Sequence, residues 1–569
     1  MTVTAAQAWP RRALDRLQDA RVCWIVLGVG MVVYAALALW LTRGTTLFVD
    51  EVNVFTVDRG FHPSALLAPL NGHLVLLQRL VWATDFKLFG PSFLVLRLVE
   101  VAGAIAAVGL FFELARRRIG AAAALAPALL LLFLGSAWEL NFVPSGIGNV
   151  YAVAAGLGAV LALERGDRRG DLIACALLAV AVASFTLGVA FAVGAAVLIL
   201  LQPGWRRRVW VAVVPLALYA AWIVWVRLEY VPTHGEIQNF HVWNILLIPN
   251  FIADEASSVA GAVAGLNYNF QPQSLYWIFS TDSPYGPVLA AAAAVALAVR
   301  LYRGSRPALL WALMAILLAF WTSLALGFDI RIGRNPVTVR YVYAGAILAV
   351  LVGAEAARGL RLSPAGLVAL YAITVVALGA NLARLRDGAH FYRSFTTSLR
   401  AQLTGLELAR DHVSPGFMAS SPTSFLAPVR AGPYLAAVDR NGSPAYSPAE
   451  LARQPEDKRH DADAVVVAAL RIGIAPAAPG ATARNCRRVA GGSSVTLPVG
   501  PPGVRLTAPA SAAIALRRYA STSTVPVGSL PPGRAVDLRI PPDRSRRTWQ
   551  AVVTPAPGGV TVCELPAGA

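Results

Sequence analysis

The sequence predicts an α-helical polytopic membrane protein that ends in a β-sandwich. Of its 569 residues, 57% are hydrophobic and only 14% are charged. A soluble protein carries roughly 25% charged residues, so the composition excludes a soluble globular enzyme. The net charge of +18 would suit a nucleic-acid-binding protein. Many arginines, however, form short clusters between apolar runs, as the positive-inside rule requires, and we expect no nucleic-acid partner.

Apolar runs of about 20 residues, the length needed to cross a bilayer, follow one another through the first two thirds of the chain. We predict about eleven spans by the hydropathy rule. They are 23–41, 93–114, 121–137, 147–163, a hairpin of two within 172–201, 209–226, 287–299, 308–326, 341–357 and 365–382. The first run is long enough to span and is followed by no small-residue cleavage site, so we expect an uncleaved helix.

Arginine clusters set the expected orientation of these spans. Clusters follow the runs that end at 114, 201 and 299, which assigns these loops and the tail 1–22 to the cytoplasm. The transmembrane module is then 23–383, with outer loops 42–92 and 227–286. The carboxyl-terminal part of the chain is expected outside the membrane, and membrane lipids surround the spans.

The last third of the chain is no longer membrane-like. We expect a mixed helical region over 384–480, with a helix that starts at the capping box Ser447-Pro448-Ala449-Glu450. Residues 481–569 predict a β-sandwich, because short apolar runs alternate there with Gly and Pro. The expected strands are 495–497, 504–506, 514–516, 536–540 and 560–562.

Four cysteines divide between the two parts. Cys23 and Cys175 lie in or at spans, whereas Cys486 and Cys563 bracket the predicted sandwich. Because this region is expected on the oxidising side of the membrane, we predict a Cys486–Cys563 disulfide.

Two adjacent carboxylates, Asp50 and Glu51, come shortly after the first span, on the expected outer side. Ionisable groups close to a hydrocarbon boundary are costly, so they need a reason. One interpretation is that the pair merely ends a helix in the headgroup zone. The other is that it takes part in chemistry.

Several polar residues that could bind a ligand lie on the same side. Arg331, Arg334 and Arg340 break the positive-inside trend, and a guanidinium matches phosphate oxygens, although they could also be solvated loop charges. Asn71 and His73 could hydrogen-bond a ligand or hold their loop. The outer histidines lack the close spacing of a metal motif, so we predict no cofactor, while a divalent metal stays open. The four histidines in question are His62, His73, His234 and His241.

An outer Val49-Asp50-Glu51 directly after the first span, in a chain of this topology, resembles the GT-C superfamily of membrane glycosyltransferases. That superfamily includes the protein O-mannosyltransferases and the lipid A aminoarabinose transferase. The resemblance covers residues 20–385 in topology. In sequence it extends to Asn71-Gly72-His73 with Arg79 and to Arg340-Tyr341-Val342-Tyr343. Asn-Gly-His is not a signature of the best-known members, so neither donor nor acceptor carries over.

The resemblance implies an enzyme that moves a sugar from a polyprenyl-phosphate donor to a cell-envelope glycan, lipid or protein outside the membrane. It implies Asp50 as the general base for the acceptor hydroxyl, with Glu51 as orienter or alternate. The residues expected to bind substrate are Asn71, His73, Arg79, Arg331, Arg334, Arg340, Tyr341 and Tyr343.

Two other functions compete with this one. A transporter or flippase of lipid-linked sugars would place ionisable groups near the midplane and often shows repeated halves. Here the charges lie at one face and no repeat is visible. A non-catalytic envelope scaffold whose sandwich binds glycan would make the acidic pair and the outer arginines dispensable.

Overall fold

The computed structural model describes residues 19–57, 60–229, 241–267, 278–329, 334–419, 429–477 and 483–566. The chain divides into two compact units. The first unit consists of Met1–Arg43, Arg59–Asp85 and Leu94–Tyr392. The second consists of Gly44–Asp58, Phe86–Phe93 and Arg393–Ala569.

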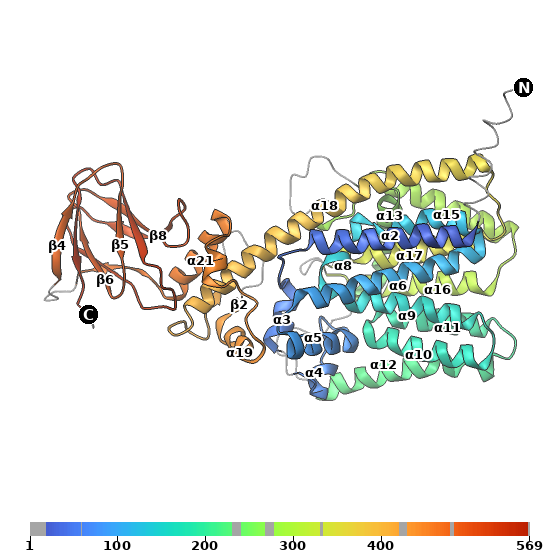
Figure 1. Ribbon diagram of the computed structural model, residues 1–569. Coiled ribbons are helices and arrows are strands. Elements are labelled where there is room, and N and C mark those ends of the chain that lie inside the picture. Colours follow the sequence, from blue (N-terminus) through green and yellow to red (C-terminus); the bar gives the residue numbers. More distant parts are fainter. Residues whose placement is uncertain are drawn as a thin grey trace, which may run out of the picture. The chain divides into compact units, whose positions relative to one another are not determined.

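The first unit is a bundle of long helices (Figure 1). Every predicted span coincides with a helix. These helices are α2 (Ala20–Leu41), α6 (Phe93–Ile119), α7 (Ala121–Leu132), α9 (Ile147–Leu163), α10 (Arg168–Ser184), α11 (Leu187–Leu200), α12 (Trp210–Glu229), α15 (Gly286–Arg303), α16 (Ala308–Leu326), α17 (Val339–Ala356) and α18 (Pro364–Leu408).

Eight helices in the described part of the chain are long and apolar enough to cross a membrane, and a bent pair makes up to nine. The bent pair joins α7 to 135–142 at an angle of 41°. The two helices of the predicted hairpin, α10 and α11, have 17 and 14 residues and fall below that length. The multi-pass character is therefore confirmed, whereas the number of eleven remains a prediction.

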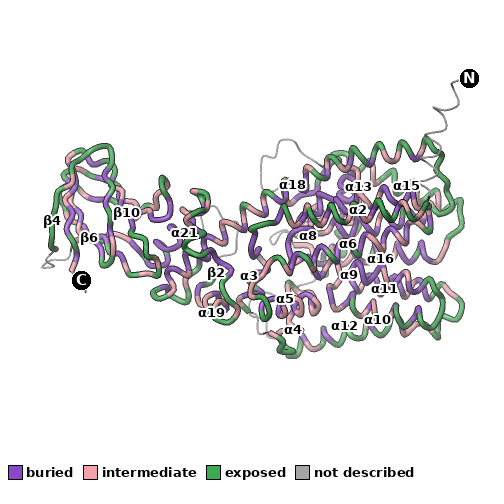
Figure 2. The backbone as a smooth tube through the Cα atoms, in the orientation of Figure 1, coloured by how far each residue is buried: buried purple, intermediate pink, exposed green. Residues whose placement is uncertain are grey.

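The bundle buries small residues inside and exposes large apolar ones outside. A Cβ at Gly156 of α9 would lie 2.3 Å from the Phe191 ring of α11, so these helices approach as closely as glycine allows. On the outside, Ile25 and Val32 of α2 are exposed, as is Val288 of α15. Exposed stretches of α2 and α15 are green in Figure 2. Exposed apolar faces of this extent fit a lipid environment.

The end of the bundle that carries the arginine clusters is held by ion pairs. Arg118 of α6 bonds Glu164, just past α9, and donates to Glu355 of α17 at 2.9 Å. Arg208 donates to both carboxylate oxygens of Asp171 at 2.6–3.0 Å. The first set of ion pairs links α6 with the end of α9 and with α17, and the second links α10 with the segment before α12.

Shorter helices belong to the predicted outer loops and the turns between spans. The helix α13 was not predicted, because the sequence of the loop 227–286 is interrupted by polar and aromatic residues. The short elements are α4 (Pro63–Leu67), α5 (Leu76–Phe89), η1 (Gly135–Ala137), α8 (Trp138–Phe142), η2 (Pro144–Gly146), η3 (Trp205–Arg207), η4 (Val242–Leu247) and α13 (Ile248–Val263).

The second unit begins with the acidic stretch and a helical layer. Helix α3 (Val49–Val57) packs on α19 (Ala431–Asn441), with the rings of Phe55 and Tyr434 6.1 Å apart. The predicted capping box of Ser447 and Glu450 is confirmed at the start of α20. The remaining elements of this layer are β1 (Met418–Ala419), β2 (Val429–Arg430), α20 (Pro448–Leu451) and α21 (Glu456–Ala469).

Two antiparallel sheets form the predicted carboxyl-terminal sandwich. The four-stranded sheet has the order β5-β10-β7-β8, and the five-stranded sheet β3-β9-β6-β11-β4. All five predicted strands are present, and the disulfide Cys486–Cys563 links the neighbouring strands β4 and β11. The strands are β3 (Gly473–Pro476), β4 (Arg484–Val489), β5 (Val495–Val499), β6 (Gly503–Thr507), β7 (Ala512–Arg517), β8 (Val525–Leu530), β9 (Val536–Arg539), β10 (Trp549–Thr554) and β11 (Val560–Glu564).

Helix α21 is bonded to the β7–β8 loop of the sandwich through two carboxylates. Asp463 is fully buried and accepts the backbone N–H groups of 518–520 at 2.8–3.2 Å. Glu456 accepts those of 521–523 at 2.7–3.0 Å. Desolvation alone would raise the pKa of Glu456, but these bonds hold it well below its usual value. The strand β3 also joins the five-stranded sheet, so sheet structure begins before residue 481.

Candidate functional site

A tight turn positions the Asn-Gly-His run in the first unit. Leu70 and His73 exchange backbone hydrogen bonds at 3.1 and 2.9 Å, and Asn71 and Gly72 between them have φ of 52° and 82°. Positive φ at both central residues is the geometry for which Asn-Gly is preferred. The turn therefore explains the Asn71-Gly72 part of the motif, and His73 is the residue that directly follows these two.

His73 is held as a neutral imidazole. Its Nδ1 lies 2.8 Å from the Thr186 hydroxyl, and its ring is 4.3 Å from that of Phe185. Burial, with Arg334 and Arg340 nearby, lowers the pKa of His73 to about 3. At neutral pH the ring is uncharged, so it can donate one hydrogen bond and accept another.

Two predicted arginines approach this turn. Arg334 donates from Nη2 to the Asn71 carbonyl at 3.1 Å. Arg340 lies in the first turn of α17, at the opposite end from Glu355, and its side chain is 38% exposed. A cation at a helix amino terminus adds to the positive end of the helix dipole. This end of the bundle therefore carries a concentration of positive charge that suits an anion.

Two acidic residues nearby were not predicted as site residues. Glu139 of α8 lies 3.7 Å from Arg340, too far for a normal hydrogen bond. Glu255 of α13 is fully buried, and neither of its carboxylate oxygens has a partner among the described residues. Burial and the neighbouring Asp254 raise the pKa of Glu255 well above its usual value. Glu139 could have been identified from the sequence, because it is an acidic residue within the otherwise apolar stretch before Pro144.

The other predicted binding residues lie in different surroundings. Arg79 donates to the carbonyls of Ala68 and Pro69 at 2.9 and 3.2 Å and so holds the segment before the turn. Tyr343 is buried, and its hydroxyl donates to the Ala104 carbonyl of α6 at 3.4 Å. Tyr341 is partly buried beside Arg340. Arg331 and His234 lie outside the described residues.

The acidic pair lies in the second unit, and its two members differ. Glu51 is buried, and its Oε2 accepts the Phe48 N–H at 2.7 Å, which fixes the start of α3. Asp50 is only partly buried and has no hydrogen bond or ion pair within the described parts of the chain. The Phe48 ring packs 4.8 Å from that of Phe395. Asp50 therefore has the freer carboxylate of the pair.

A divalent metal was left open by the sequence. Within the described ranges, no group of three or more His, Cys, Asp or Glu side chains is arranged to hold a metal ion.

No protein-family model and no curated protein matches the chain. Among solved structures, it is similar to the crystal structure of ArnT from Cupriavidus metallidurans bound to undecaprenyl phosphate. That match has 15% identity and a TM-score of 0.43, over 73% of this chain and 84% of that chain. It is also similar to the archaeal oligosaccharyltransferase AglB from Archaeoglobus fulgidus in complex with an inhibitory peptide and a dolichol-phosphate. Here the identity is 14% and the TM-score 0.41, over 74% of this chain and 64% of that chain.

Similarity at this level carries over neither a residue role nor a substrate.

Proposed function

We propose that this chain is a membrane glycosyltransferase. It would move a sugar from a polyprenyl-phosphate donor to an acceptor of the cell envelope on the outer face of the membrane. The observation that carries the proposal is the positive charge of Arg334 and Arg340 around the neutral His73, at the end of the bundle away from the paired arginine clusters. A lipid-linked phosphate is an anion that a multi-pass protein meets at such a boundary.

The donor phosphate would bind between the two arginines. A guanidinium offers parallel N–H donors that match phosphate oxygens, and the amino terminus of α17 favours negative charge. The ion pair with Glu139 at 3.7 Å would orient Arg340. His73 and Asn71 would hydrogen-bond the leaving oxygen or the sugar hydroxyls.

The acceptor hydroxyl needs a base as it attacks the anomeric carbon. Asp50 would take its proton while the bond between sugar and phosphate breaks and the polyprenyl phosphate leaves. The free carboxylate of Asp50 supports this role, and the bond from Phe48 to Glu51 supports an orienting role for Glu51. A transporter is disfavoured because Arg334 and Arg340 lie at one end of the helices of the first unit rather than near their middle.

The phosphate site is tested through Arg340→Lys, which keeps the charge but removes the parallel donors. We expect affinity for polyprenyl phosphate to fall by about 10- to 100-fold, the loss of a hydrogen bond to a charged group. The measurement is lipid binding by the purified protein in nanodiscs. Arg358→Lys, just past the opposite end of α17, is the matched control and should bind as the wild type does. Wild-type affinity in Arg340→Lys would reject the phosphate role.

The orientation of the bundle is a separate proposal and needs its own test. Reporter fusions after Arg118, Arg208 and Arg306 should report the cytoplasm. Fusions after Asp254 and Asp411 should report the outside. A cytoplasmic signal after Asp254 would contradict an outer active site.

A further inference from the structure

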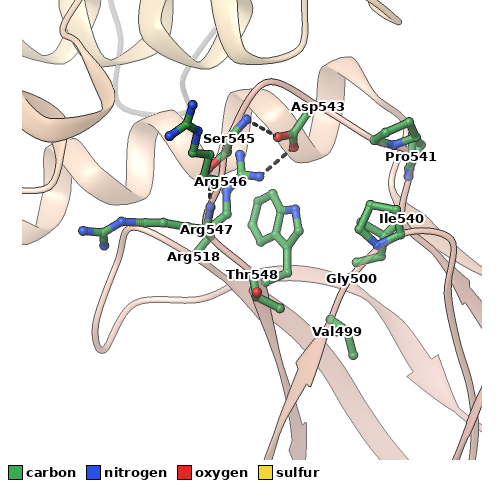
Figure 3. Close-up of a pocket in the computed structure, with 13 residues that line it drawn as sticks. Val499, Gly500, Arg518, Ile540, Pro541, Asp543, Ser545, Arg546, Arg547 and Thr548 are labelled. Carbon is green, nitrogen blue, oxygen red and sulfur yellow. Dashed lines mark hydrogen bonds and ion pairs between the residues drawn. The ribbon is translucent and has the colours of Figure 1, made fainter.

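The second unit contains a cavity of about 180 Å³ at one end of the sandwich (Figure 3). The ends of β5, β7 and β9 and the start of β10 meet there. Arg518 and Asp543 lie on one side of the view, and Ile540 and Pro541 on the other. The lining residues are Val499, Gly500, Pro501, Arg518, Ile540, Pro541, Pro542, Asp543, Ser545, Arg546, Arg547, Thr548 and Trp549.

Arg518 is buried in the wall of this cavity with half of its guanidinium unused. Its side chain is 1% exposed, Nη1 donates to Asp543 at 2.6 Å, and the guanidinium lies 4.2 Å from the Trp549 ring centre. Nε and Nη2 are also buried, and they have no hydrogen-bond partner among the described residues. A buried charged donor without a partner is costly, so this edge of Arg518 needs an acceptor.

The unused edge is the one that binds carboxylates elsewhere in this unit. Arg505 donates from Nε and Nη2 to the two oxygens of Asp537 at 2.7 and 3.0 Å. Arg544 binds Asp411 through the same two atoms, both at 2.8 Å. Bidentate pairing of this kind is specific for planar or tetrahedral oxyanions. Arg518 presents the same pair of donors without a protein oxyanion.

The remaining polar groups of the wall also favour an anion. The indole N–H of Trp549 is buried and has no acceptor among the described residues. Asp543, the acidic residue of the lining, is already bonded to Arg518 and accepts the Ser545 N–H at 2.8 Å. Arg546 and Arg547 are exposed in the lining. Arg518 and Trp549 therefore bring more buried donors to this wall than Asp543 accepts.

We infer that this cavity binds an oxyanion, the carboxylate or phosphate group of an acidic sugar unit. Arg518 would hold two of its oxygens through Nε and Nη2, and Trp549 would donate to the ligand. Drug-sized pockets are typically about 300–1,000 Å³, so a cavity of 180 Å³ limits the ligand to one small unit. The sugar part of the inference rests on the proposed function, because an envelope acceptor would supply it, whereas the oxyanion part does not.

The test measures binding of glucuronic acid, glucose 1-phosphate and glucose to the full-length protein in nanodiscs by ligand-observed NMR. At least one charged sugar should bind, and glucose should not. Arg518→Lys should weaken binding by about 10- to 100-fold, because it loses the bidentate edge. Trp549→Phe keeps the aromatic ring and should also weaken binding, which leaves a second test if Arg518→Lys does not fold. Arg544→Lys, whose edge is occupied by Asp411, is the matched control and should bind normally.

The outcomes separate the ligand sources. Tighter binding of glucuronic acid would show that the cavity recognises a carboxylate. Tighter binding of glucose 1-phosphate would show that it recognises a phosphate. Equal binding of glucose, no binding at millimolar concentration, or wild-type affinity in both Arg518→Lys and Trp549→Phe would overturn the inference. Binding of inorganic phosphate as tight as that of glucose 1-phosphate would overturn the sugar part. Asp50→Asn should bind the sugar normally, so failure of this site is distinguishable from failure of the proposed transfer reaction.

Discussion

Substitutions of Asp50 and Glu51 should separate catalysis from stability, although the two residues are neighbours with the same functional group. Asp50 has no described polar partner, so Asp50→Asn removes no bond from the described part of the folded protein. If Asp50 is the general base, this change should lower turnover by about 10²- to 10⁴-fold. The melting temperature of the variant should remain that of the wild type.

Glu51 should behave in the opposite way. Its carboxylate accepts the Phe48 N–H at 2.7 Å and is buried. Glu51→Ala removes a charge-assisted bond and leaves the N–H without its acceptor, at a cost of about 1.5–3 kcal/mol. For a unit of this size, each kcal/mol lowers the melting temperature by about 2–4 °C. Glu51→Gln keeps an acceptor oxygen, so it should cost about 1 kcal/mol and retain most of the turnover below its melting temperature.

The assay is sugar transfer from a synthetic polyprenyl-phosphate sugar by purified protein in nanodiscs, with thermal unfolding followed by intrinsic fluorescence. The control residue is Asp439, an exposed acid of α19 in the same unit. Asp439→Asn should affect neither turnover nor melting by much. Wild-type turnover in Asp50→Asn and in the double variant would refute the assignment of the base. A melting loss in Asp50→Asn equal to that of Glu51→Ala would refute the separation of roles.

Three further predictions concern stability. The folded state holds His73 neutral with a pKa of about 3 against an ordinary 6.5, so stability should fall as pH drops below about 6.5. In His73→Gln the free energy of unfolding should therefore fall less between pH 7 and pH 4 than in the wild type. The difference should be about 1–2 kcal/mol, a value reduced because the His73 side chain is partly exposed, and melting curves at several pH values would measure it. Glu456→Gln places an amide against backbone donors and should cost about 1–2 kcal/mol in chemical unfolding, with Asp457→Asn as an exposed control. Cys486→Ser should destabilise the sandwich by about 4 kcal/mol, and peptide mapping that finds two free thiols in the oxidised wild type would contradict the disulfide.

The helices of the bundle could be predicted because a span must be uniformly apolar along its length, which is a local property. Helix α13 could not, because its apolar residues cover only one face and are interrupted by Asn250, Asp254 and Glu255. Strands β4 and β8 were not predicted either. Strand β4 is rich in arginine, and β8 contains Pro526 and Gly528, so neither shows a clear strand pattern.

The candidate site was predictable only in part. Arg334 and Arg340 differ from the arginine clusters between spans because the predicted order of spans assigns them to the opposite side of the membrane. The nearness of Glu139 to Arg340 depends on how α8 and α17 pack, and no local pattern encodes it. Asp50 and Glu51 are equivalent in the sequence. The structure distinguishes them, because the Glu51 carboxylate accepts the Phe48 N–H.

The attachment of α21 to the β7–β8 loop determines where the carboxyl-terminal domain can be excised. A fragment that begins at residue 481 would lose strand β3 and both carboxylates that bind the backbone of 518–523. Those amides would be left without their acceptors, beside the wall of the Arg518 cavity. A fragment that begins at the capping box of Ser447 keeps α21 and β3 with both sheets. Limited proteolysis should therefore release a stable fragment that starts near residue 447 rather than near 481.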